Sequence, residues 1–376
     1  MLNSIKNLLG INIYQPLNLI EVSKENLIKN YQYLSSLSSG IRIAPVLKSN
    51  AYGHGLVNVG KVLDNLEVPF FCVDSIYEAY ELLKSKVKTP ILITGYVNPN
   101  NLKVKQLPFS FAVWNLELVE SISKHQPNAS IHLFIDTGMH REGITLDDLP
   151  EFLVQIKEYK NLKLDGIMSH FASVKNTHDP LYINQLENFK KALEICKKDA
   201  LSFKWIHIAA SDGLQNGDLK TLSKITNVAR VGLALYGVSE KKENLNPALT
   251  FKTKIVQIKK LKKGESVGYD GTFIASHDML IGILPAGYND GIDRRLSNKG
   301  FVKIEDKYCK IIGRVSMNLC TIDLSPVKNP QIGSEVIIYS DNPEDKNSIL
   351  KLASSIYTIP YELLIHLTST TKRIAA

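Results

Sequence analysis

Short apolar runs alternate with amphipathic stretches along the chain from residue 41 to residue 237. The amphipathic stretches carry apolar residues at three- and four-residue spacing, as in 76–85 and 183–198, which is typical of helices with one buried face. The apolar runs are short and often rich in β-branched residues, which indicates buried strands. Eight such runs occur: 43–48, 69–75, 90–95, 109–114, 131–136, 164–170, 205–211 and 227–237.

One strand and one helix recur roughly every 25 to 30 residues along this part of the sequence. The pattern predicts an α/β fold in which the eight strands close into a (β/α)8 TIM-like barrel. A doubly wound open sheet is the alternative, but no GxGxxG motif follows any of the runs, and that motif marks the dinucleotide-binding form of the open sheet.

The pattern changes after residue 247, where apolar runs are punctuated by Gly, Pro, Asn and Asp. These runs predict a mostly antiparallel β domain, with helical sequence near its end at 349–357 and 360–367. We therefore expect two domains, a barrel over 14–246 and a C-terminal β domain over 247–376. Residues 1–13 are expected to pack with the second domain.

Lys48 stands at the C-terminal end of the first apolar run and is followed by SNAYGHG. Most lysines at such ends are simply solvated. In a barrel, however, the C-terminal ends of the strands carry the chemistry, and a partly desolvated lysine has a lowered pKa and acts as a nucleophile or base. Asp136, His170 and Ser211 are predicted at the same end of the barrel.

The charge balance narrows the possible partners. Lys and Arg outnumber Asp and Glu by 45 to 37, but the excess is spread along the chain without interleaved aromatic residues, which disfavours nucleic acid and suits a small anionic ligand. The four cysteines form no CxxC pair or Cys/His ligand set, so we expect reduced core thiols, no metal site and a cytoplasmic protein. No segment reaches the ~18 to 20 apolar residues of a membrane span.

Seven motifs follow one another along the chain: VLKSNAYGHG (46–55), DTGMHREG (136–143), SHFAS (169–173), ARVGLALYG (229–237), SVGYDGTF (266–273), PAGYNDGIDRR (285–295) and IGRVSMN (312–318). In type and order they resemble the motifs of the alanine racemase family. The resemblance covers nearly the whole chain, and seven ordered motifs are far more specific than any one alone.

The resemblance implies a cofactor, pyridoxal 5'-phosphate (PLP), and the racemisation of L-alanine and D-alanine, which supplies D-alanine for cell-wall peptidoglycan. Lys48 matches the residue that carries PLP and acts as the base on one face of the substrate, and Tyr269 matches the base on the opposite face. The residues expected to bind the cofactor are Lys48, Tyr52, His170, Ser211, Arg230, Gly232, Leu233 and Tyr361.

The resemblance also implies a homodimer with shared active sites, in which Tyr269 reaches the PLP of the other subunit. Arg141 and Met317 match residues that bind the substrate carboxylate. Tyr288 and Arg294 match residues that line a narrow entry to the site.

The chain departs from the family pattern at three places. Phe134 replaces a lysine that is carbamylated in many members and that orients the arginine matching Arg141. Asn318 replaces an aspartate, and 370–373 reads TTKR instead of an RVPR-like segment. We expect Arg141 to have a substitute partner, which is an acidic side chain, ordered water or, as the favoured choice, a simple anion.

Other functions remain as alternatives at this point. One alternative is a racemase of serine or of a broader range of amino acids. Another is a different PLP enzyme of the same fold, such as a decarboxylase or an aldolase. Decarboxylases of this fold place an acidic residue at the pyridine nitrogen of PLP. The resemblance implies that Arg230 faces this nitrogen, which argues against a decarboxylase. Small PLP-carrying relatives without catalysis end after the barrel, whereas this chain continues through Tyr269.

Overall fold

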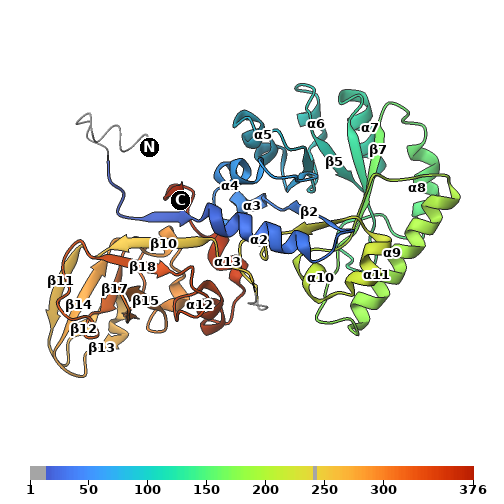
Figure 1. Cartoon of the computed structure of the whole chain (residues 1–376). Helices are drawn as coiled ribbons and strands as arrows, with labels where there is room; N and C mark the ends of the chain where they lie inside the picture. The colour runs from blue at the N-terminus through green and yellow to red at the C-terminus, as the bar shows by residue number, and fades with distance from the viewer. Residues whose placement is uncertain (1–13, 240–243) are drawn as a thin grey trace. The chain divides into compact units, whose positions relative to one another are not determined.

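The computed structural model describes residues 14–239 and 244–376, which form two compact units (Figure 1). Within the described residues, one unit is 23–248 and the other joins 14–22 to 249–376. The units therefore divide close to the boundary expected near residue 247, while 14–22 belong with the C-terminal unit instead of the barrel. The expected packing of 1–13 lies outside the described residues.

The first unit contains eight parallel strands that close into the expected barrel. They are β2 (Arg42–Pro45), β3 (Phe71–Val73), β4 (Ile91–Ile93), β5 (Ser110–Val113), β6 (Ser130–Phe134), β7 (Lys163–Met168), β8 (Trp205–His207) and β9 (Val228–Val231). Strands β3 to β8 form one sheet, and β2 pairs with β9. Backbone hydrogen bonds from Leu47 to Cys72 (2.8 Å) and from Arg230 to Ala209 (2.9 Å) join the two sheets into a closed ring.

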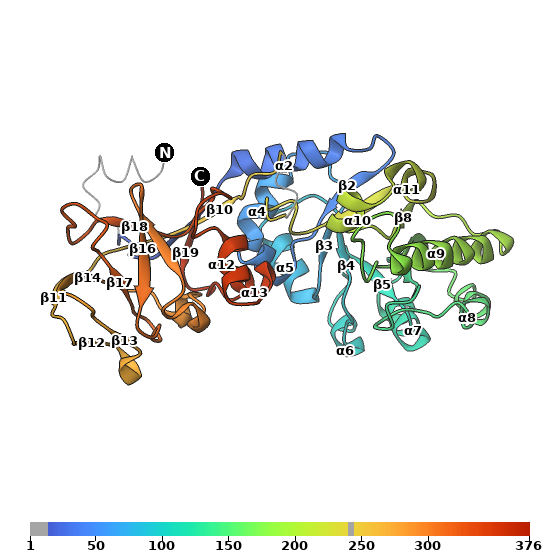
Figure 2. The same ribbon diagram turned by 90° about the horizontal axis from the view of Figure 1, so that it is seen from below.

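Helices surround these strands within the unit, as Figures 1 and 2 show. They are α2 (Lys24–Ser36), α4 (Leu56–Leu63), α5 (Ile76–Lys84), α6 (Pro99–Leu102), α7 (Leu116–His125), α8 (Leu149–Ile156), α9 (Pro180–Lys198), α10 (Ser211–Asn216) and α11 (Leu219–Ile225). Helix α9 buries Leu186 and Phe189 on the face that its apolar spacing predicts. The side chain of Ser75 accepts a hydrogen bond from the backbone of Glu78 and caps the start of α5.

Two strands are shorter than predicted. The run 227–237 is a strand only to Val231, because turns begin at Gly232 and Gly237 has a φ of +73°. The run 205–211 is a strand only to His207, because Ser211 already begins α10. The polar groups after these strands therefore lie in loops and helix starts.

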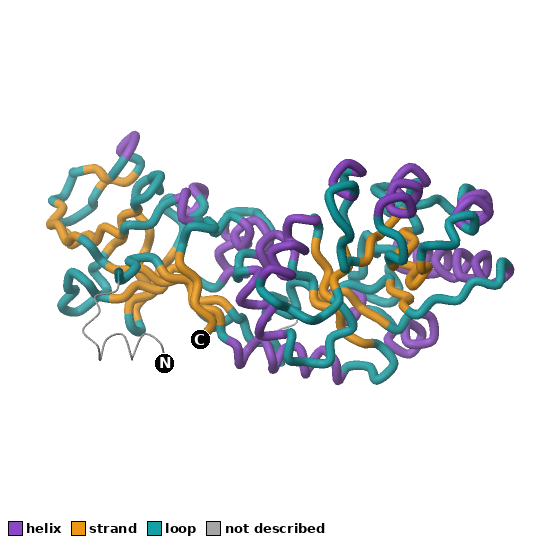
Figure 3. Tube along the Cα trace, turned by 90° about the horizontal axis from the view of Figure 1, so that it is seen from above, coloured by secondary structure: helices purple, strands orange, loops and turns teal. Residues whose placement is uncertain are grey.

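The second unit is mostly antiparallel, as predicted, and its strands lie side by side in Figure 3. Its nine-stranded sheet has the order β11-β14-β17-β16-β15-β18-β10-β1-β19. The bounds are β1 (Leu19–Val22), β10 (Leu249–Lys254), β11 (Gln257–Leu261), β14 (Met279–Leu284), β15 (Phe301–Ile304), β16 (Lys307–Ile312), β17 (Cys320–Asp323), β18 (Glu335–Tyr339) and β19 (Lys372–Ala375).

Short elements complete the second unit. They are the hairpin of β12 (Ser266–Val267) and β13 (Phe273–Ile274), the 3-10 turns η1 (Tyr269–Gly271), η2 (Tyr288–Asp290) and η3 (Arg294–Leu296), and the helices α12 (Ile349–Ser355) and α13 (Pro360–Ile365). Strand β1 pairs antiparallel with β10 and parallel with β19, which explains why residues 14–22 belong to this unit. No helix within the described ranges has the length and apolar character needed to cross a membrane.

Two buried histidines lie among the apolar side chains of the barrel interior. The Nδ1 of His132 lies 2.8 Å from the Nε2 of His207, and Phe70 packs against both rings. A Cβ atom at Gly166 would lie 2.3 Å from His132, so the neighbouring strand needs glycine to make room for the imidazole. The Nη1 of Arg230 donates to the Nδ1 of His207, which assigns the His207 proton to Nε2 and makes His207 the donor to His132.

Burial lowers the pKa of His132 to about 3, and burial lowers that of His207 well below its usual range, with Arg230 adding to both effects. The unfolded chain binds a proton at each histidine near pH ~6.5. Below that pH the unfolded state carries more protons than the folded state. The free energy of unfolding must therefore decrease as the pH is lowered.

We expect the free energy of unfolding, measured in urea, to fall between pH 6.5 and pH 5 by up to ~1.4 kcal/mol per pH unit for each histidine that stays neutral in the fold. The variant His132→Asn keeps a polar partner for His207 and should have a shallower slope. The variant His178→Asn, which changes an exposed side chain, should keep the slope of the parent. Equal slopes for all three proteins would contradict the assignment of a neutral His132.

Candidate functional site

The barrel gathers the predicted residues at one end because parallel strands point the same way. Strands β6, β7, β8, β9 and β2 are consecutive neighbours around the ring. Arg141, His170, Ser211, Gly232 and Lys48 follow these strands in that order. Lys48, His170 and Ser211, which were predicted at the C-terminal ends of the strands, therefore lie at one end of the barrel together with Arg141 and Gly232.

Lys48 does not sit on a strand, as the sequence suggested, but begins a tight turn. Strand β2 ends at Pro45, and α3 (Lys48–Tyr52) follows with positive φ at every residue from Ser49 to Tyr52. Left-handed backbone costs roughly 1–2 kcal/mol for each non-glycine residue. The lysine side chain is 41% exposed, with its Nζ 3.4 Å from the Oδ1 of Asp74, so it is less desolvated than expected.

Specific hydrogen bonds hold this strained turn. The Oε1 of Glu78 accepts from the backbone N–H of Ser49 (2.6 Å), and its Oε2 accepts from that of Asp74 (2.9 Å). The side chain of Asn50 accepts from the backbone of Leu56 (2.9 Å). Glu78 thus fixes both the start of the turn and the carboxylate that pairs with Lys48. Backbone strain supported in this way is characteristic of functional sites.

Arg230 is buried, and its guanidinium links the ends of three strands. Its Nη1 donates to the Nδ1 and the carbonyl of His207, and its Nη2 donates to the carbonyl of Ser169 (2.6 Å) and the Nδ1 of His170 (3.1 Å). Burial lowers the pKa of Arg230 to about 10, so it remains charged at neutral pH. Burial, with Arg230 second, lowers the pKa of His170 to about 3, so this imidazole is neutral.

Hydroxyl and amide groups converge beside this arginine. The Oγ of Ser211 accepts from the backbone N–H groups of Gly232 (3.2 Å) and Ala234 (3.4 Å). A Cβ atom at Gly232 would lie 2.7 Å from the hydroxyl of Tyr52, so these groups meet only because residue 232 is glycine. Such a set of N–H and O–H groups suits a phosphate. Leu233 is part of the same loop.

Arg141 lies in the loop after β6 and pairs with the residue that follows it. Its Nε and Nη2 both bind the carboxylate of Glu142, the second at 2.8 Å. Phe134, at the end of β6, is buried and packs edge-to-face on Trp114. Of the partners expected for Arg141, the structure shows the acidic side chain.

The second unit has a pocket of its own with a volume of about 580 Å³. It is lined by Tyr269, Tyr288, Arg294, Val315, Ser316 and Met317. The backbone carbonyl of Met317 accepts from Asn289 (2.9 Å), and a Cβ atom at Gly287 would lie 2.1 Å from the carbonyl of Ser316. This close approach of two loops places four of the predicted residues, Tyr269, Tyr288, Arg294 and Met317, around one cavity.

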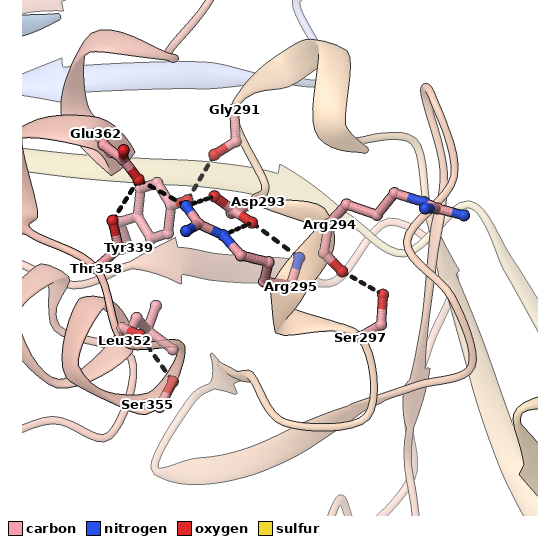
Figure 4. A network of polar contacts seen from close by, with 10 residues as sticks. All are labelled: Gly291, Asp293, Arg294, Arg295, Ser297, Tyr339, Leu352, Ser355, Thr358 and Glu362. Atoms are coloured by element: carbon pink, nitrogen blue, oxygen red, sulfur yellow. Dashed lines mark hydrogen bonds and ion pairs between the residues drawn. The ribbon is translucent and has the colours of Figure 1, made fainter.

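A polar network holds η3, which carries Arg294, to α13 (Figure 4). Arg295 binds Asp293 (2.7 Å) and Glu362 (2.7 Å), and the hydroxyl of Thr358 donates to Glu362. In Figure 4, Arg295 points into this network whereas Arg294 extends away from it. Glu362 directly follows Tyr361, so the network fixes the backbone on which the remaining predicted residue sits.

The sequence did not single out several residues of the site. His207 could have been found, because its strand lies next to those of Arg230 and His170 and its run places a histidine close to the strand end. Glu78 and Asp74 carried no such signal, since a glutamate on an amphipathic helix and an aspartate after a strand are ordinary features. Glu142 was visible beside Arg141 in the sequence but looked like a solvated loop residue.

Comparisons with known proteins agree with this arrangement. The family "Alanine racemase, N-terminal domain" matches residues 22–240, and "Alanine racemase, C-terminal domain" matches 248–375. The chain is 35% identical to an alanine racemase of Borreliella burgdorferi, covering 94% of this chain and 96% of the relative. It is 34% identical to one of Lactobacillus acidophilus, covering 88% and 89%.

Solved structures give the same result. An alanine racemase of Clostridium difficile superimposes with a TM-score of 0.88 at 25% identity, covering 97% of both chains. The alanine racemase of Bacillus anthracis with bound L-Ala-P gives a TM-score of 0.87 at 26% identity, covering 97% of this chain and 96% of the other. Both domains, the order of the motifs and the fold thus agree, and the chain belongs to the alanine racemase family.

Proposed function

We propose that the protein is a PLP-dependent enzyme that interconverts L-alanine and D-alanine. The observation that carries the proposal is the set of groups at the barrel end: the lysine amine of Lys48, a cradle of hydroxyl and amide groups, and the buried guanidinium of Arg230. Membership of the alanine racemase family supports alanine as the substrate. The role in supplying D-alanine for peptidoglycan, and a cytoplasmic location, belong to the same proposal.

The residues present fit PLP. Lys48 would attach the cofactor, Tyr52, Ser211, Gly232 and Leu233 would hold its phosphate together with Tyr361, and His170 would lie against its ring. When bound, PLP withdraws electrons from the substrate carbon and makes its proton removable. Arg230 would face the ring nitrogen, and because a guanidinium stays protonated it would not transfer a proton there.

Two bases on opposite faces would complete the racemisation. The amine of Lys48 would hold or release the proton on one face, and the phenol of Tyr269 would do so on the other. Arg141 and the backbone of Met317 would hold the substrate carboxylate, while Tyr288 and Arg294 would limit access. Arg230 disfavours a decarboxylase or aldolase. An acidic residue at the ring nitrogen would make PLP a stronger electron sink, and Arg230 would stand in its place.

The exposed position of Tyr269 supports a shared site in a homodimer. Tyr269 is 68% exposed and Met317 is 57% exposed, which is unusual for residues that would work away from water. A second copy of the chain would cover them and supply the barrel that they serve. The rim residues of such a site would come from both subunits.

The purified protein with added PLP should convert L-alanine into D-alanine, followed by optical rotation. Borohydride reduction and peptide mass mapping should place the pyridoxyl group on Lys48, because no other group of the cluster combines an amine with this position. The variant Lys84→Ala removes an exposed lysine from α5 and should retain the label. A pyridoxyl group on another lysine would overturn the assignment of the site.

Mixing inactive Lys48→Ala and Tyr269→Phe subunits tests the shared site. If each site combines Lys48 of one subunit with Tyr269 of the other, a mixed dimer has one intact site, so activity should return to about a quarter of the wild-type value after random exchange. Activity is measured after subunit exchange has been verified with tagged chains. Exchange without any recovery would show that Tyr269 does not act across the interface.

A further inference from the structure

The loop that carries Arg141 and Glu142 is fixed at several points. The Oδ1 of Asp136 accepts hydrogen bonds from the backbone N–H groups of Gly138 (2.9 Å), Met139 (3.0 Å) and His140 (3.1 Å). Two backbone hydrogen bonds, from Ile144 to Phe134 (2.8 Å) and from Asp136 to Ile144 (2.9 Å), return the loop to its strand. The loop therefore presents its side chains from a defined backbone.

Gly143 makes this conformation possible. Its φ is +131°, and a Cβ atom there would lie 2.5 Å from the backbone nitrogen of Asp136. From the other side, the side chain of Asn188 on α9 donates to the carbonyl of Thr137 (3.0 Å). Glu142 precedes this constrained glycine, so its carboxylate starts from a fixed Cα position beside Arg141.

The contact between Arg141 and Glu142 uses one particular edge of the guanidinium. Glu142 occupies the Nε–Nη2 edge through both of its oxygens. The Nη1–Nη2 edge points elsewhere and retains N–H groups that match a second carboxylate in bidentate geometry. The arginine is 54% exposed and the glutamate 26% exposed, so the open edge is accessible to a ligand.

The pair also lies within electrostatic reach of the buried cation. Arg141 lowers the pKa of Arg230 and Glu142 raises it, and Arg141 lowers the pKa of His170. Phe134 at the end of the same strand is packed into the barrel and offers no charge. The carboxylate of Glu142 is therefore the group that both orients Arg141 and compensates its charge at this place.

We propose that Glu142 is a positioning residue for substrate binding, which holds Arg141 with its Nη1–Nη2 edge directed toward the carboxylate of alanine. The inference rests on the proposed racemase function, since it assigns Arg141 to the substrate carboxylate. The contact with Glu142 restricts the flexible side chain of Arg141 to one preferred orientation. Arg141 therefore loses less conformational entropy when the substrate binds.

Two effects of Glu142 oppose each other. Its negative charge repels the substrate carboxylate, but it lies on the far edge of the guanidinium in a half-exposed loop, where water screens the repulsion. Ordering the arginine acts directly on the contact with the substrate. Orientation therefore outweighs repulsion, and removal of the carboxylate weakens substrate binding.

The test compares the variants Glu142→Ala and Glu142→Gln with the parent enzyme, all loaded with PLP. We expect KM for L-alanine to rise roughly fivefold in Glu142→Ala while kcat changes less than about twofold, because the lost contact is one of binding. Glu142→Gln keeps one acceptor and should fall between the two. The control Glu187→Ala removes a carboxylate from the exposed Lys190–Glu187 pair on α9 and should leave KM unchanged.

A binding measurement tests the role of Glu142 without catalytic turnover. Propionate is alanine without its amine, so its calorimetric affinity for the PLP-loaded protein reports the carboxylate contact, and we expect it to weaken roughly fivefold in Glu142→Ala. Failure of the parent to racemise alanine would refute the proposed function alone, since propionate binding is still measurable. Unchanged propionate affinity in a folded Glu142→Ala protein, or tighter binding in Glu142→Gln, would overturn the role of Glu142.

Discussion

The buried guanidinium of Arg230 is the constraint on which the site depends. It joins β9 to the ends of β7 and β8 through four hydrogen bonds, with two carbonyls and two imidazoles as acceptors. Burying a cation among neutral acceptors is costly, and its pKa of about 10 records that cost. The fold nevertheless keeps a positive charge at the barrel end. Burial and this charge together lower the pKa values of His170 and His207, so both imidazoles are neutral.

The turn after Lys48 is a second place where the structure accepts strain for position. Four consecutive non-glycine residues have left-handed backbone, which no strand or right-handed helix would need. Glu78 and Asn50 stabilise it through backbone N–H groups, and Tyr236 donates its hydroxyl to the carbonyl of Val46 (2.9 Å) just before the turn. The amine therefore emerges beside Asp74 from a rigid base, which would suit the attachment of a cofactor that we propose for Lys48.

The barrel and the β domain could be predicted because their patterns are repetitive. Alternating apolar runs and amphipathic stretches report burial directly, and the end of each strand then locates Asp136, His170 and Ser211. The left-handed turn could not be predicted, because positive φ at Ser49 to Tyr52 depends on hydrogen bonds from a distant helix. The same holds for the pairing of Arg141 with Glu142, which depends on the loop geometry set by Gly143 and not on local propensity.

In the proposed enzyme, Arg230 would keep the environment of the PLP ring cationic, so that the ring nitrogen would carry no proton. The most direct measurement is the ¹⁵N chemical shift of the ring nitrogen in the protein reconstituted with ¹⁵N-labelled PLP at neutral pH. We predict the shift of an unprotonated pyridine nitrogen that accepts a hydrogen bond. The shift of a protonated pyridinium in the same sample would contradict the account.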